Sequence, residues 1–286
     1  MKSLDLNSVT RLKSIISLLD DEDNYVYRQV RESLLTFGES ALPHLDDYLN
    51  TSNPVLNERV REAYDLILID SVKDQFRSFR RRFPSDLDLE EGVFLIAHLG
   101  YPQTDMRIYQ DLLNFFASEL QPRMDSLDAP EDIVQKIAKY FTVDKGFGGI
   151  DREYYNPDSH YLTKVLESKK GVPIALSSIY LLVLRKLNIP VRGIGMPGHF
   201  IIRYDFEGRS LLADPSDAGK ILSPEDCKDY LMKMGYQYNV SYLEPVDNKQ
   251  ILERMLRNLV LVYEKQGQTA KVQGILQCID ILNSIV

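Results

Sequence analysis

The sequence predicts a helix-dominated α+β protein, and three features of its 286 residues lead to that class. Apolar residues recur at helical spacing before residue 170 and again after residue 250. The stretch 174–187 is apolar nearly all round, which predicts a central buried helix that begins at Pro173. After Pro190 the apolar period changes from 3.6 to 2, as in β-strands. A buried helix followed by an antiparallel meander is an α+β pattern.

The first segment, residues 1–85, predicts a helical hairpin. Val26, Val30 and Leu34 recur every four residues, and Gly38 follows where helices commonly end. Asn53 is a polar cap before Pro54, so we expect the next helix to begin there. This order of a helix, a terminating glycine and a second helix resembles a HEAT-type helical hairpin. Because such a hairpin cannot bury its apolar stripe alone, we expect it to stack on neighbouring elements.

The second segment, residues 86–245, predicts further helices and then strands. Its helices are indicated by apolar stripes at Leu89, Val93, Ile96 and Ala97, at Ile108, Leu112, Leu113 and Phe116, at Ile133, Ile137 and Phe141, and at Tyr161, Leu162, Val165 and Leu166. Residues 145–158, rich in glycine and tyrosine, predict an irregular loop. The predicted strands are 191–196, 199–204 and 209–214, with a turn at 205–208. Ser223 and Pro224 then begin a helix.

The third segment, residues 246–286, predicts a TPR-like helical hairpin with its turn at 266–268. Leu252, Leu256, Leu259 and Tyr263 form the apolar stripe of its first helix. We expect this pair to dock on the rest of the chain or to cap it.

Composition bears on the partners and the compartment. Acidic residues number 42 against 34 basic ones, for a formal charge of −8, so neither nucleic acid nor an anionic membrane is the expected partner. The beginning of the chain lacks the apolar region of a signal peptide. The longest uncharged stretch, 171–184, is shorter than the roughly 20 residues that cross a bilayer. Two cysteines make no disulfide framework, and we expect a cytoplasmic protein.

A group of short motifs resembles one known family. These motifs are Asn156–Leu162, Val165–Glu167, Gly171–Ser177, Ile189–Gly193, Pro197–Phe200 and Asp214–Pro215, with the flanking helical segments Leu89–Tyr101 and Ile251–Tyr263. Together they resemble the bacterial SirB-type transglutaminase-like family over residues 86–280. The resemblance implies a papain- or transglutaminase-like core and a TPR-like tail.

The resemblance also implies where a catalytic site would lie. Active members of the superfamily carry a cysteine in the first turn of the central helix, then a histidine and an aspartate. A helix N-terminus and an imidazolium both lower a thiol pKa, and the carboxylate orients the imidazole. His199 and Asp214 take the histidine and aspartate positions. The cysteine position is occupied by Pro173, which has no nucleophile and suits the first turn of a helix.

Other candidate nucleophiles and ligands are weaker. Ser177 lies one turn after Pro173, but a serine in a buried helix more often bonds its own i−4 carbonyl. The pattern puts neither Cys227 nor Cys278 near His199, and each is expected to act as a small hydrophobe. His160 and His199 lack the spacing of a zinc motif, so we expect no metal, and no phosphate-binding pattern suggests a cofactor. His98 is expected to be a core histidine.

These observations favour a non-catalytic interaction or regulatory protein with a protein partner. The alternative is a hydrolase or acyltransferase that acts on peptide or amide bonds, using His199 and Asp214 with an unrecognised nucleophile.

Overall fold

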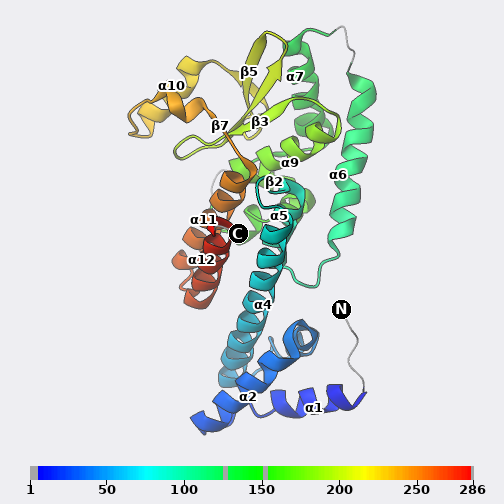
Figure 1. Ribbon diagram of the computed structural model, residues 1–286, viewed down its shortest axis with the longest axis vertical. Helices are drawn as coiled ribbons and strands as arrows, with labels where there is room; N and C mark the ends of the chain where they lie inside the picture. Colours follow the sequence, from blue (N-terminus) through cyan, green and yellow to red (C-terminus); the bar gives the residue numbers. More distant parts are fainter. Residues whose placement is uncertain (1–5, 125–127, 151–153, 285–286) are drawn as a thin grey trace.

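The computed structural model describes residues 6–124, 128–150 and 154–284, and Figure 1 shows their arrangement. The first helices are α1 (Leu6–Ile16), α2 (Asn24–Phe37), α3 (Leu42–Asp46) and the long α4 (Pro54–Arg82). The predicted helix ends are present. Gly38 ends α2 with φ +55°, and the Asn53 side chain caps α4 by accepting from the N–H groups of Val55 and Leu56.

Helix α4 runs from the N-terminal helices at one end of the molecule to the middle of the fold (Figure 1). There α12 (Thr269–Asn283) lies against α4, so the last helix of the fold packs on a helix from the N-terminal segment. The two backbones come close because Gly274 of α12 faces Ile69 of α4, and a Cβ on that glycine would overlap the Ile69 side chain.

Gly274→Val should therefore destabilise the protein by about 1–3 kcal/mol, the usual cost of overpacking a filled core. Helix propensity alone favours valine over glycine by only a few tenths of a kcal/mol, too little to offset that cost. Thermal unfolding followed by circular dichroism measures the change. Gln277→Val, at an exposed position of the same helix, is the control and should shift Tm little.

The middle helices are α5 (Leu89–His98), α6 (Met106–Leu120) and α7 (Pro130–Lys139), which continues into a π-helical turn, Tyr140–Asp144. One residue of the predicted stripe on α6 is wrong, because Ile108 is 63% exposed. Tyr109 takes its place in the core with Leu113 and Phe116. The buried face therefore begins one residue later, and the Tyr109 hydroxyl donates to Glu167 on α8 (Leu162–Ser168).

The predicted central helix is α9 (Pro173–Lys186), and every residue from Ile174 to Leu184 is buried. A short parallel pair of strands precedes α9. β1 (Gly148–Gly149) lies in the predicted loop, and β2 (Lys170–Gly171) lies directly before the helix.

A five-stranded antiparallel sheet packs on α9, in the order β6-β5-β4-β3-β7. Its strands are β3 (Val191–Ile194), β4 (Ile201–Phe206), β5 (Arg209–Asp214), β6 (Lys220–Leu222) and β7 (Pro245–Val246). The three predicted strands are present; β5 has the predicted bounds, and the other two have shifted ends. β3 stops two residues early, and β4 starts two residues late and extends into the predicted turn. β6 and β7 were not predicted, because two or three residues carry no readable period.

The two faces of the sheet carry separate apolar clusters. Ile202 and Ala213 join the large core with α9, whereas Ile201 and Leu212 pack on the other face against α10 (Pro224–Lys233). The predicted start of α10 is a capping box formed by Ser223 and Asp226. This alternation confirms the period of 2 and the α+β class.

The tail is the predicted helical pair, α11 (Asn248–Lys265) and α12, with its turn at 266–268. α11 packs on α5, where Leu252 fills the space beside Gly92. The large core is continuous from Leu12 to Leu282. The division into segments 1–85, 86–245 and 246–286 stays a prediction. Within the described residues, no helix combines the length and apolar character needed to cross a membrane.

Candidate functional site

A tight turn between β3 and β4 holds His199. The N–H of His199 donates to the Met196 carbonyl at 3.1 Å, and Pro197 and Gly198 occupy the centre of the turn. Gly198 has φ +71°, so the sequence Pro-Gly fits a type II turn. His199 therefore lies in the loop before β4, two residues outside the strand in which the period of 2 had put it. Arg254 of α11 donates from Nη2 to the His199 carbonyl at 2.8 Å.

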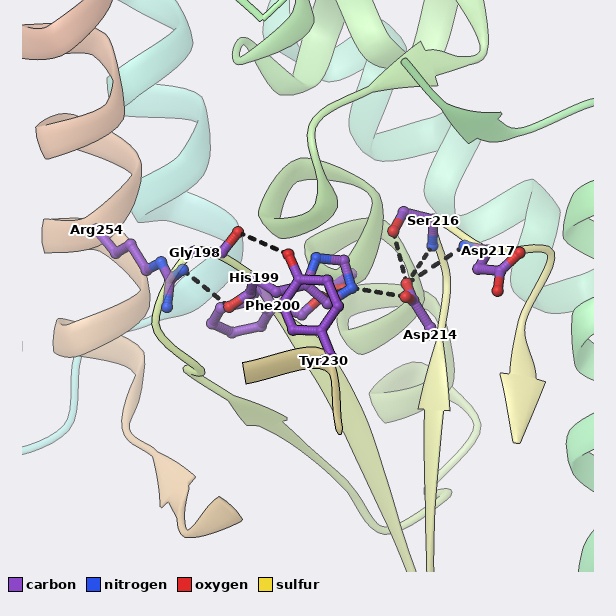
Figure 2. A network of polar contacts seen from close by, with 9 residues as sticks. Gly198, His199, Phe200, Asp214, Ser216, Asp217, Tyr230 and Arg254 are labelled. Carbon is purple, nitrogen blue, oxygen red and sulfur yellow. Dashed lines mark hydrogen bonds and ion pairs between the residues drawn. The ribbon is translucent and has the colours of Figure 1, made fainter. Parts of the chain in front are cut away.

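The expected hydrogen bond between His199 and Asp214 is present. His199 Nε2 lies 2.6 Å from Asp214 Oδ2, and both side chains are nearly buried. The other carboxylate oxygen, Oδ1, accepts from the N–H of Ser216 at 2.8 Å and from its hydroxyl at 2.6 Å. Figure 2 shows this network, in which Asp214 and Arg254 approach His199 from opposite sides.

Two opposing effects act on the Asp214 carboxyl group. Burial by itself would raise its pKa, but the hydrogen bonds from His199 and Ser216 outweigh burial and hold the pKa below its ordinary value. Because the pKa is lower in the folded chain, the carboxylate stabilises the fold above the unfolded-state pKa of about 3.9. That contribution is lost as the pH falls through the folded-state pKa.

We expect Asp214→Asn to lower the free energy of unfolding by about 1.5–3 kcal/mol at pH 7, the range for a hydrogen bond to a charged group. The difference from the parent chain should begin to shrink below about pH 4, where the carboxyl of the unfolded chain takes up a proton, and should disappear only below the lower pKa of the folded chain. Urea unfolding at pH 7, 5 and 3.5 measures this. Asp229→Asn, at an exposed position of α10, is the control and should change little at any pH. A pH-independent difference would contradict the depressed pKa.

The candidate nucleophile positions on α9 do not offer a group to His199. Pro173 occupies the first position of the helix, as predicted. Ser177 is buried and donates to the Phe200 carbonyl at 3.3 Å, so its expected i−4 bond is wrong. The start of β4 packs against this turn of α9 and presents that carbonyl as the acceptor. Ser178 makes the i−4 bond instead, to Ile174 at 2.8 Å.

The structure puts Cys227 nearer to His199 than the sequence pattern indicated. α10 folds back over the sheet, and Cys227 joins His199, Asp214 and Tyr230 in the lining of a cavity of about 240 Å³. Burial, with Asp226 and Asp214 nearby, raises the pKa of the Cys227 thiol to about 11. Cys278 lies on α12, where burial raises its pKa to about 12. Both thiols are therefore protonated at neutral pH.

His160 and His98 each have a hydrogen-bond partner away from His199. His160 is buried, and its Nε2 lies 2.7 Å from the Tyr154 carbonyl, while burial lowers the pKa of its imidazole. His98 was expected in the core, but it is only partly buried and bonds Glu39 at 3.1 Å. It thereby links α5 to the turn that follows α2. Over the ranges that the structure describes, no group of three His, Cys, Asp or Glu side chains could hold a metal ion.

Fold and site together define a class: an α+β domain with a central buried helix, an antiparallel sheet and a His–Asp pair that joins the turn before β4 to the end of β5. The chain belongs to the transglutaminase-like superfamily, whose family model matches residues 108–257. The expected resemblance to the SirB-type transglutaminase-like family is confirmed at this level.

Proteins from bacteria and from human are similar to this chain in sequence. A UPF0162 protein of Xylella fastidiosa (strain 9a5c) is 31% identical over 183 residues, which cover 62% of this chain and 65% of the relative. A UPF0162 protein of Pseudomonas aeruginosa is 24% identical over 58% of this chain and 60% of the relative. Human F-box only protein 21 is 29% identical over 96% of this chain and 38% of its own length. The chain thus spans less than two thirds of the length of each of these three relatives. No solved structure matches the chain.

Three residues around His199 were missed by sequence reasoning. Ser216 follows Asp214 by two positions, and this Asp-x-Ser spacing is a known turn signal that could have revealed it. Tyr230, whose ring lies 4.9 Å from the His199 ring, and Arg254 reach the site from α10 and α11. No local pattern marks either of them, because only the packing of those helices brings them there.

Proposed function

We propose that this chain is a non-catalytic interaction protein, built on a transglutaminase-like core whose His199–Asp214 pair serves as a structural hydrogen bond. The observation that carries the proposal is Pro173 at the start of α9, where active members of the superfamily have a cysteine. The bond would fasten the turn before β4 to the end of β5. Its buried carboxylate needs no further role, since Asp214 is fully hydrogen-bonded.

The comparison with human F-box only protein 21 supports a role as an interaction module. Almost the whole length of this chain, 96%, aligns with only 38% of that relative. A sequence similar to this chain therefore occurs as one part of a larger protein. We propose that the partner is a protein, that the HEAT-like and TPR-like helices supply binding surfaces, and that the protein acts in the cytoplasm.

A second candidate is a hydrolase or acyltransferase on peptide or amide bonds, with Cys227 as its nucleophile. The observation that favours it is the shared cavity, which brings this thiol to the same space as His199 and Asp214. Against it stands the pKa of about 11, because the thiolate and not the thiol is the nucleophile. The two candidates differ in how the thiol should react.

Alkylation with iodoacetamide at pH 7.5, followed by mass spectrometry, separates them. If the protein is non-catalytic, Cys227 and Cys278 label slowly, and His199→Ala does not slow the labelling of Cys227. His44→Ala, in α3 and far from the cavity, is the control variant. Fast stoichiometric labelling of Cys227 that falls about ten-fold or more in His199→Ala would establish an activated thiol and overturn the proposal.

A further inference from the structure

Arg254 is a partly buried cation without a carboxylate partner in the part of the chain that the structure describes. Its guanidinium donates one hydrogen bond, to the His199 carbonyl, and lies 5.6 Å from the centre of the Phe200 ring. Arg257, one turn further along α11, is exposed and pairs with Glu253. The half-buried Arg254 thus has no carboxylate partner, while its exposed neighbour Arg257 has one. Desolvation favours the opposite arrangement, because a buried charge gains more from a partner than an exposed charge does.

Tyrosines surround the same turn. The Tyr230 hydroxyl lies 3.4 Å from the Gly198 carbonyl, within reach of a weak bond. The Tyr236 ring would lie 3.6 Å from a Cβ on Gly198 and is 44% exposed. Tyr154, 38% exposed, is close enough for its hydroxyl to interact electrostatically with the guanidinium. Phenol groups from three separate segments therefore gather around one cation at the surface.

The electrostatic state of Arg254 indicates which ligand would suit this place. Burial lowers its pKa, since desolvation disfavours the charged form, and the nearby tyrosines offset this only in part. A guanidinium has five N–H donors in a planar fork, which matches the two oxygens of a carboxylate. One cation balances the single charge of a carboxylate, whereas a phosphate carries close to two charges. Tyrosine hydroxyls can donate to the same oxygens, and their rings offer apolar contact to a peptide.

We propose that Arg254, Tyr236, Tyr230 and Tyr154 form a carboxylate-binding site beside the His199 turn, which takes an acidic side chain or the C-terminal carboxylate of a protein partner. The inference rests on the proposed interaction function and names the chemistry that the partner would present. The site lies on the side of His199 opposite Asp214 (Figure 2). The ligand would complete the charge balance that the chain itself leaves open at Arg254.

The test is a titration of the full chain, followed by NMR of the arginine Nε–Hε resonances. N-acetylglycine presents a C-terminal carboxylate, and N-acetyl-aspartate amide presents an acidic side chain. N-acetylglycinamide and N-acetyl-asparagine amide are the neutral counterparts. We expect at least one acid to shift the Arg254 resonance to saturation, and both neutral compounds to leave it unchanged. The acid that binds more tightly identifies the source of the carboxylate.

Variants assign the binding to this guanidinium. Because the variants lack the Arg254 resonance, their binding is followed through the backbone N–H resonances of the His199 turn, measured in the parent chain as well. Arg254→Gln should weaken the binding of the acid about ten-fold or more, because a charge-assisted bidentate bond is lost. Arg254→Lys keeps the charge but not the planar guanidinium, so its affinity for the acid should lie between those of the parent chain and Arg254→Gln. It replaces the glutamine variant if that variant folds poorly. Arg257→Gln is the control and should bind as the parent chain does.

Equal responses to the acids and their neutral counterparts, or unchanged binding in both Arg254 variants, would overturn the carboxylate site. Neither result touches the alkylation experiment, which tests the absence of catalysis separately. Conversely, an activated Cys227 together with acid binding at Arg254 would overturn the non-catalytic proposal and leave the carboxylate site in place as a substrate contact.

Discussion

Truncation after Val246 should leave a chain that no longer unfolds cooperatively. It removes α11 and α12, whose buried side chains pack on α4, α5 and α9. The buried apolar residues lost are Ile251, Leu252, Met255, Leu256, Leu259, Val260, Val262, Tyr263, Val272, Ile275, Cys278, Ile279 and Leu282. Each large side chain contributes roughly 1.5–3 kcal/mol on burial. Their sum exceeds the 5–15 kcal/mol that typically holds a domain together.

Circular dichroism and binding of a dye for apolar surface measure this effect. We expect the truncated chain to lose its sharp thermal transition and to bind the dye. Single substitutions on α11 supply a matched comparison. Leu259→Ala, at a fully buried position, should cost about 2–5 kcal/mol. Leu261→Ala, at a position that is 50% exposed, should cost less than about 0.5 kcal/mol. An unchanged Tm after truncation would refute the docking of the tail on the core.

Pro173→Cys should create a thiol far more reactive than either natural cysteine. The new side chain would stand at the N-terminus of α9, where the helix dipole favours an anion. If the superfamily arrangement holds, the His199 imidazole also stands beside it. Both neighbours favour thiolate, so the thiol should titrate below about 8.5, against about 11 for Cys227. We predict no turnover, because a thiol alone does not supply an oxyanion hole or a substrate groove.

The expected gain in alkylation rate is about ten-fold or more. At pH 7.5 the lower pKa raises the thiolate fraction by more than about a hundred-fold, and the weaker intrinsic nucleophilicity of a less basic thiolate takes back about ten-fold. The control is Pro54→Cys, which also begins a helix whose first turn has no acidic residue, but lies far from His199. Iodoacetamide kinetics between pH 5 and 9 give the pKa of each new thiol.

The double variant Pro173→Cys, His199→Ala separates the two causes, since only the helix remains to lower the pKa. If Pro173→Cys reacts no faster than Pro54→Cys, His199 does not face the start of α9. The assignment of Pro173 to the cysteine position would then be wrong.

Local sequence patterns were enough to predict most of the helices. The caps of α4 and α10, the glycine after α2 and the turn at 266–268 each depend on neighbours within a few residues. The all-apolar composition of α9 predicted its central place for a related reason, since only a buried position suits such a helix. The motifs from 156 to 215 likewise indicated the transglutaminase-like family, and the family model confirmed it.

The shortest strands, and the exact buried face of α6, could not be predicted from the sequence. β6 and β7 exist because β5 and β3 offer them hydrogen-bonding edges, and this condition cannot be read from two or three residues. On α6, apolar residues occur at both Ile108 and Tyr109, so spacing alone did not decide which of them faces the core. The contact with Glu167, 58 residues away in the chain, is the feature that distinguishes Tyr109.

The sequence by itself determined the helix-dominated class, the family, the pairing of His199 with Asp214 and the start of α9 at Pro173. Tertiary structure alone decided what surrounds those residues. It turned the Ser177 hydroxyl to the Phe200 carbonyl, brought Cys227 into the cavity beside Asp214 and set Arg254 against the His199 turn. The reason is physical: a cap or a turn depends on residues close in the chain, whereas a buried contact depends on how helices far apart in sequence pack against one sheet.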